Sequence, residues 1–235
     1  MRLRPEPMAD ENSVYKIRGG LTGCWGSQVS VSPARRAASG QDSAASPLGG
    51  CILSSMAARI AGFRGEFLWE LEIAERQIVS IAECTPAEQY DWRPVAQARS
   101  FSEVFVHVAT GNFMLLDVIG VAAPVDLYAQ VPADGDARFQ GLIRRNDELA
   151  ASMREKDAVV GLLKRSLHAV AQSLANASDG ELNRRLNFFG EETTVRRVYL
   201  RLLAHIDEHM GQMTAYLRFN RIAPPWPDWR HDRRT

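Results

Sequence analysis

Cysteine, net charge and long apolar runs are all scarce in this sequence of 235 residues. The three cysteines, Cys24, Cys51 and Cys84, are far apart and form no CxxC pair, which argues against a disulfide framework or a thiolate zinc site. The 28 basic residues balance 28 acidic ones, so no global field attracts nucleic acid or an anionic membrane. No stretch approaches the ~18 apolar residues of a membrane span. We therefore expect a soluble, cytoplasmic protein that binds neither nucleic acid nor membrane.

The first part of the chain differs in composition from the rest. Residues 1–58 are rich in Gly, Ser, Pro, Ala and Arg without a sustained hydrophobic period, so they cannot bury enough apolar surface to offset the entropy of ordering. The stretches LTGC and LGGC in this part imitate lipoprotein signals, but neither follows the apolar segment of ~7–15 residues that secretion needs. We predict a disordered N-terminal extension over 1–58, one domain over 59–229 and a flexible tail over 230–235.

Apolar residues then recur at spacings of three and four, which is the period of an amphipathic helix. This pattern predicts four long helices, over 63–84, 100–120, 155–178 and 194–220. Ser100 and Glu103 have the spacing of a capping box at the start of the second helix. The connections are expected to be loops, apart from a short helix over 138–153. With no convincing strand, the fold class expected is all-α, a four-helix bundle.

Two histidines interrupt the apolar run LLAHIDEHMGQM in the fourth helix. His205 and His209 are four residues apart, so they share one face of the helix with Cβ atoms ~5–6 Å apart and can bind one metal ion. Leu202 and Met213 lie on the same stripe, which indicates that this face turns inward. A second interpretation stays open, in which each buried imidazole is only hydrogen-bonded to a neighbouring group.

A third histidine favours the metal site. His107 lies on the inward stripe of the second helix, whereas His168 shares its face with charged residues and His231 lies in the tail. Three inward imidazoles from two helices make a three-nitrogen site with an open fourth position, as in metal sites that bind water or substrate. His107, His205 and His209 are therefore the candidate metal ligands.

The stretch from His205 to His209 also fits H-x-x-E-H, the signature of inverted zinc peptidases in which the glutamate activates water. That family takes its third ligand from a glutamate further along the chain, and no glutamate follows His209 here. The peptidase interpretation is therefore set aside. Glu208 is adjacent to the inward face, so we expect it to be a solvated helix charge.

The segments YDWRP, SFSEVFVHVATGN and LLAHIDEHMGQMTAYLRFNRIAPPW resemble the DinB-like superfamily over roughly residues 60–229. The resemblance implies an up-down-down-up four-helix bundle, often a homodimer, that binds zinc or nickel. It also implies one ligand histidine on the second helix and an HxxxH pair on the fourth, which fall on His107, His205 and His209. Arg221 departs from the pattern, because it stands where the family is expected to have glycine at the end of the fourth helix.

Relatives implied by this resemblance include metal-dependent transferases and isomerases that use low-molecular-weight thiols. The leading hypothesis is a metal-dependent thiol S-transferase, or a hydrolase, acting on a small-molecule substrate, since an open metal site would lower the pKa of a bound thiol or water. The alternative is a non-catalytic metal-binding or stress-response protein of the same fold. Asp117 and Gln212 are candidates to accept the second ring N–H of a ligand histidine.

Overall fold

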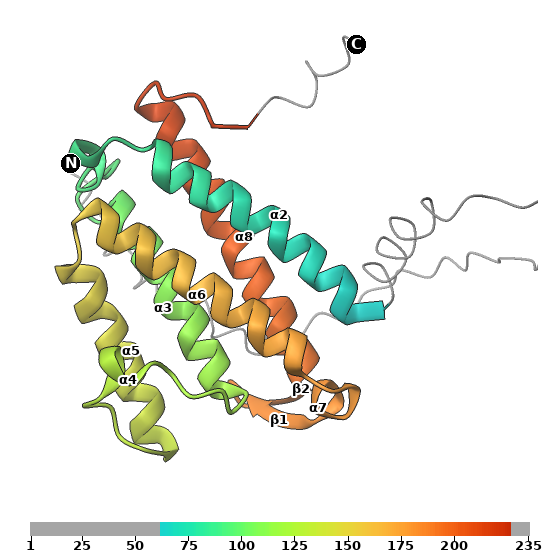
Figure 1. Ribbon diagram of the computed structural model, residues 1–235. Coiled ribbons are helices and arrows are strands. Elements are labelled where there is room, and N and C mark those ends of the chain that lie inside the picture. The colour runs from blue at the N-terminus through green and yellow to red at the C-terminus, as the bar shows by residue number, and fades with distance from the viewer. Residues whose placement is uncertain (1–61, 227–235) are drawn as a thin grey trace, which may run out of the picture. The chain divides into compact units, whose positions relative to one another are not determined.

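The computed structural model describes residues 62–226. The predicted disordered extension over 1–58 and the predicted tail over 230–235 lie outside the described residues. The described part is mostly helical (Figure 1). Its helices and strands, in chain order, are α2 (Gly62–Cys84), the 3-10 turn η2 (Ala87–Gln89), α3 (Phe101–Val118), α4 (Val125–Tyr128), α5 (Gly135–Ser152), α6 (Lys156–Asn176), α7 (Asp179–Asn183), β1 (Arg185–Phe188), β2 (Glu191–Thr194) and α8 (Val195–Phe219).

The four helices predicted to be long correspond to α2, α3, α6 and α8, each within two residues of its predicted bounds. The helix α2 packs against α6 and α8, and α3 packs against α5, α6 and α8. The apolar stripe predicted for α6 is buried along its whole length, so the period of 3.6 correctly identified the side that faces the core. These contacts place α3 beside α8, the two helices that carry the candidate ligands.

Both ends of α3 are formed as its sequence predicts. The Ser100 hydroxyl accepts a hydrogen bond from the Glu103 N–H, and the Glu103 carboxylate accepts one from the Ser100 N–H, which confirms the capping box. At the other end, Gly120 has φ +92° and its N–H bonds to Asp117, while the Val121 N–H bonds to Leu116. This is a Schellman motif, in which glycine adopts the left-handed conformation without steric cost.

The helix α8 ends in the same motif despite the departure from the family pattern at Arg221. The N–H groups of Arg221 and Ile222 bond to the carbonyls of Arg218 and Leu217, and Arg221 has φ +60°. An arginine with this φ carries a steric cost of roughly 1–2 kcal/mol that glycine avoids. The helix terminus therefore forms as it would with glycine, at a cost to stability.

The connections are more regular than the sequence indicated. Residues 178–192 were expected to be a polar loop, but the short helix α7 is followed by an antiparallel hairpin in which Arg185 pairs with Thr194 and Phe188 with Glu191. Phe189 and Gly190 form its turn with φ values of +53° and +87°, and the Asn187 side chain accepts a bond from the Gly190 N–H. The prediction of a loop is therefore wrong for this segment.

The expected short helix over 138–153 is also longer than predicted. The helix α5 has 18 residues, as many as α3, and α4 lies within the connection that was expected to be a loop.

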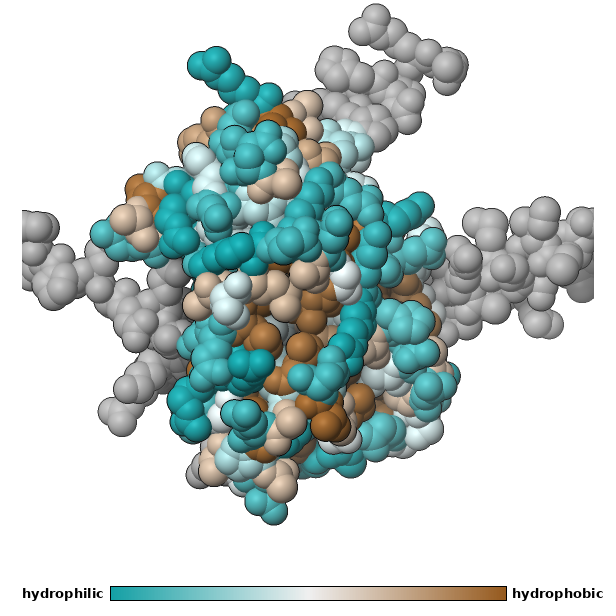
Figure 2. Space-filling view, turned by 60° about the vertical axis from the view of Figure 1, so that its left-hand side comes forward, coloured by the Kyte–Doolittle hydropathy of each residue, from teal (hydrophilic) through white to brown (hydrophobic). Residues whose placement is uncertain are grey.

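Within residues 62–226, no helix has both the length and the apolar character needed to cross a membrane. The face in Figure 2 is mostly hydrophilic, with hydrophobic side chains gathered near its centre.

Candidate metal centre

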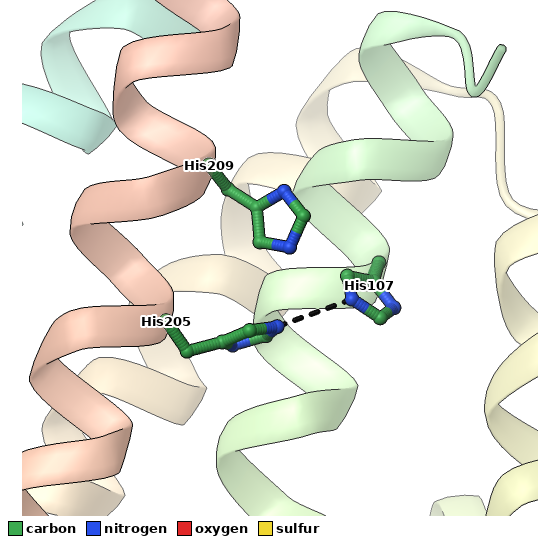
Figure 3. A group of neighbouring side chains, drawn as sticks. All are labelled: His107, His205 and His209. Carbon is green, nitrogen blue, oxygen red and sulfur yellow. Dashed lines mark hydrogen bonds between the residues drawn. The ribbon is translucent and has the colours of Figure 1, made fainter. Parts of the chain in front are cut away.

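Three imidazoles converge between α3 and α8. His107 extends from α3, and His205 and His209 extend toward it from successive turns of α8 (Figure 3). One ring nitrogen from each residue lies within 4.8 Å of the other two. The ring centroids are 5.0 Å apart for His107 and His205, 4.8 Å for His107 and His209, and 4.6 Å for His205 and His209. The structure thus brings together the three histidines that the sequence singled out.

His205 is the most buried of the three. Its Nε2 lies 3.1 Å from Nε2 of His107, and its buried Nδ1 has no hydrogen-bond partner among residues 62–226. The ring packs directly over Gly111 of α3, where a Cβ atom would lie only 2.7 Å from the His205 Cε1. Gly111 is one turn after His107 on the same helical stripe. A glycine on an apolar helix face is a signal of close approach, and here it makes room for an imidazole.

His209 is held by a chain of hydrogen bonds. Its Nδ1–H donates to Gln212 Oε1 at 2.8 Å, Gln212 Nε2 donates to the Tyr216 hydroxyl at 3.0 Å, and that hydroxyl donates to the Arg99 carbonyl at 3.1 Å. The bond to Gln212 fixes the tautomer of His209, so the lone pair is on Nε2. Gln212 therefore has the orienting position that the sequence analysis considered for it.

Burial keeps the imidazoles neutral. It lowers the pKa of His107 to about 2 and that of His205 to about 3, and it also lowers the pKa of His209. The positive charge of Arg99 acts in the same direction on all three. A neutral imidazole has a lone pair for a metal, so the cluster is in the ligating protonation state at neutral pH.

Other candidates from the sequence lie elsewhere. Glu208 is exposed and bonds to Arg201, as expected for a solvated helix charge. Asp117 is not an orienting group for these histidines, because its carboxylate binds the Arg138 guanidinium and accepts from the Ala123 N–H. His168 is exposed on α6, and His231 lies beyond the last described residue.

Comparison with known proteins identifies the family. A family model for the DinB superfamily matches residues 70–213, a range that includes all three histidines. The chain belongs to the DinB superfamily. Among solved structures, this DinB protein is similar to a DinB-like protein from Bacillus cereus, with 16% sequence identity and a TM-score of 0.51 over 72% of this chain and 97% of that chain. That likeness supports the fold alone. No curated protein matches the chain.

The cluster of this DinB protein suits a divalent ion. Two nitrogens bound to one zinc at ~2.0–2.1 Å can be at most about 4.2 Å apart. The pair formed by His107 and His205 is already within that limit at 3.1 Å, and small side-chain rotations bring a cluster that spans 4.8 Å inside it. Without an ion, one neutral imidazole of this pair donates to the other at 3.1 Å, and a bound ion would take the place of that shared proton.

Proposed function

We propose that His107, His205 and His209 hold one divalent ion, zinc or nickel, with a coordination position left open for a small-molecule substrate. The observation that supports this proposal best is the convergence of three neutral imidazoles, with nitrogens within 4.8 Å, from two helices. Family membership supports it as well, since the matched range includes all three residues. Three histidines leave the coordination sphere one ligand short of the usual four for zinc, as in catalytic sites.

When bound, such an ion would supply a Lewis acid that lowers the pKa of a coordinated thiol or water. The carboxylates of α3 and α8 do not supply a free general base. Glu103 and Asp117 are each held by arginine, Glu208 is bonded to Arg201, and Asp207 is exposed. A reaction that needs little help from a base therefore suits this site, and a low-molecular-weight thiol that reacts as a thiolate meets that condition.

The resulting proposal is a metal-dependent thiol S-transferase of the cytoplasm, built on an up-down-down-up bundle of α2, α3, α6 and α8 and acting as a homodimer. The pairwise contacts of these four helices support the bundle. The second candidate is a metal-binding or stress-response protein without turnover. On α3 and α8, each carboxylate is either paired with an arginine or, as for Asp207, exposed to solvent. This favours the second candidate over a hydrolase, because hydrolysis would need a base to activate water.

Elemental analysis of the purified protein, dialysed without chelator, tests the metal site. We expect about one zinc or nickel per chain in the wild type, and loss of the metal in both His205→Ala and His107→Ala, because affinity depends on all three ligands together. His168→Ala is the matched control, since it removes an exposed imidazole on α6 and should keep the metal. Wild-type protein that neither contains nor takes up zinc or nickel would contradict the proposal.

A thiol titration then separates the two candidates. Adding a low-molecular-weight thiol to protein loaded with cobalt in place of zinc should produce a thiolate-to-metal absorption band if the open position accepts sulfur. Transfer of that thiol to an electrophilic acceptor, lost in His205→Ala, would establish the transferase. Metal binding without the band favours the protein without turnover.

A further inference from the structure

Arg99 is fixed beside the histidine cluster through its backbone. It directly precedes Ser100, the N-cap of α3, and its carbonyl accepts the hydrogen bond from Tyr216 that ends the chain leading to His209. The Tyr216 ring is itself held in place, because Trp92 and Phe101 pack edge-on against it with centroids 5.4 and 5.5 Å away. The backbone of Arg99 is thus tied to the same hydrogen-bond chain that orients a candidate ligand.

The side chain of Arg99 differs from those of the neighbouring arginines in its ion pairing. Arg93 and Arg154 both pair with the Glu103 carboxylate, at 3.0 and 2.8 Å. Arg99 is half-buried, yet among residues 62–226 no carboxylate forms an ion pair with it and no side chain or carbonyl accepts a hydrogen bond from its guanidinium. None of its guanidinium nitrogens is among the buried, unpaired side-chain atoms of residues 62–226, so they reach the surface, where a ligand that supplies an acceptor can replace water.

The positive charge around the cluster is also only partly compensated by carboxylates of the described residues. Three neutral imidazoles with a divalent ion carry a charge of about +2, and Arg99, whose charge acts on all three imidazoles, adds one more. Glu103 and Asp117 are paired with other arginines, and Asp207 faces solvent. The negative charge of Glu208 does raise the pKa of His205 and His209, but its carboxylate is paired with Arg201, whose charge lowers them. A partly buried group of cations needs a counter-charge, and here the substrate is left to provide it.

We propose that Arg99 binds an oxyanion of the small-molecule substrate, a carboxylate or a phosphate, while another atom of the same molecule takes the open position at the metal. This inference rests on the proposed function, since it places the substrate between the metal and Arg99. The guanidinium offers two parallel N–H donors that match either oxyanion. Arg99 would then select anionic substrates over neutral ones of the same shape.

Calorimetric titration of zinc-loaded protein tests this inference with three probes: acetate, methyl phosphate and the neutral isostere acetamide. Acetate or methyl phosphate should bind the wild type and should bind Arg99→Gln about tenfold more weakly or worse, as expected for loss of a charge-assisted hydrogen bond. Which of the two binds more tightly distinguishes a carboxylate from a phosphate substrate. Acetamide should show no difference between the proteins.

Two further variants make the result decisive. Arg64→Gln is the matched control, because it removes an arginine of α2 that pairs with Asp179 instead, and it should bind the anions as the wild type does. Arg99→Lys keeps the charge and should recover part of the affinity. Both Arg99 substitutions keep the carbonyl that holds Tyr216, and circular dichroism checks that the helices are intact.

The possible failures have different meanings. If neither wild type nor Arg64→Gln takes up zinc, the proposed function falls, and this inference falls with it. If zinc binds but the wild type binds neither anion, or Arg99→Gln binds both as tightly as the wild type, the inference about Arg99 is wrong while the metal site stands.

Discussion

Two polar clusters lie one turn apart on α3, and they are built in opposite ways. In the first, the Glu103 carboxylate accepts hydrogen bonds from the Ser100 N–H at 2.7 Å, from Arg93 at 3.0 Å and from Arg154 at 2.8 Å. Burial raises the pKa of Glu103, but these hydrogen bonds and the charge of Arg154 outweigh it and hold the pKa below its usual value. Every charge in this cluster has its counterpart within the chain.

The histidine cluster, which starts at His107, has no such counterpart. Nδ1 of His209 donates to Gln212, but Nε2 of His205 faces Nε2 of His107, and Nδ1 of His205 has no partner among residues 62–226. The pKa values are lowered chiefly by burial. The contrast teaches that burying polar groups is not by itself a sign of function. The Glu103 cluster is complete and holds the start of α3 in place, whereas the histidine cluster is incomplete, which agrees with the proposed metal site.

Lowering the pH should have the largest effect, because it should destabilise the protein through the histidine cluster before it affects the Glu103 cluster. Because the folded pKa values of His107 and His205 are about 2 and about 3, below the ~6.5 of an unfolded chain, the unfolded state binds more protons below pH 6.5. Stability is therefore full above that pH and falls as the pH falls. Metal-free protein should lose about 3 kcal/mol of unfolding free energy between pH 7.5 and 5.5.

Urea denaturation at the two pH values, in the presence of chelator, measures this loss. The contribution of Glu103 should remain, because its lowered folded pKa means that its stabilisation is lost only below its unfolded value of ~4.3. Equal stability at both pH values would mean that the buried histidines become protonated without unfolding.

Gly111→Ala should damage the histidine cluster alone. The new Cβ would lie 2.7 Å from Cε1 and 3.3 Å from Nδ1 of His205, so the ring must move. With a strain of about 2 kcal/mol, zinc affinity should fall about thirtyfold. Competition with a zinc-binding dye measures it. Gly161→Ala on α6 is the control, because nothing lies within 4 Å of its Cβ position, and unchanged affinity in Gly111→Ala would show that His205 is not a ligand.

Glu103→Gln should have the smallest effect, and it should weaken the Glu103 cluster without affecting the histidine cluster. Glutamine can still form the capping box, but the charge pairs with Arg93 and Arg154 are lost, which should lower the unfolding free energy by about 1 kcal/mol. Zinc content should not change. Chemical denaturation and elemental analysis of one preparation test both statements, and loss of zinc in this variant would show that the two clusters are coupled.

The helices and the inward position of the histidines could be predicted from the sequence, because both depend on local periodicity. The stripe of α6 and the inward faces of His107 and His205 follow from a repeat of 3.6 residues that the core then preserves. The hairpin escaped prediction because each strand has only four residues and its turn places Phe189, which is not a typical turn residue, at positive φ.

Hydrogen-bond partners that lie far apart in the sequence were the other feature that could not be predicted. Asp117 was a reasonable candidate to orient a histidine from its place on α3, but Arg138 of α5 binds its carboxylate, and no local pattern indicates that pairing. Gln212 and Tyr216 are visible as neighbours one turn apart, whereas the bond from Tyr216 to Arg99 joins residues 117 positions apart. The closeness of the three histidines was thus predictable, and the groups that orient them or set their charge were only partly so.

The hydrogen bonds from His209 to Arg99 also set the alignment of two helices. His209, Gln212 and Tyr216 occupy successive turns of α8, and the last of them is anchored to the backbone just before α3 begins. A shift of α8 along α3 by one turn, ~5.4 Å, would break this connection and separate the imidazoles of the two helices. The segment before α3 therefore fixes the alignment of α8 with α3 at the site. We expect a change in the length of this segment to alter metal selectivity without replacing any candidate ligand.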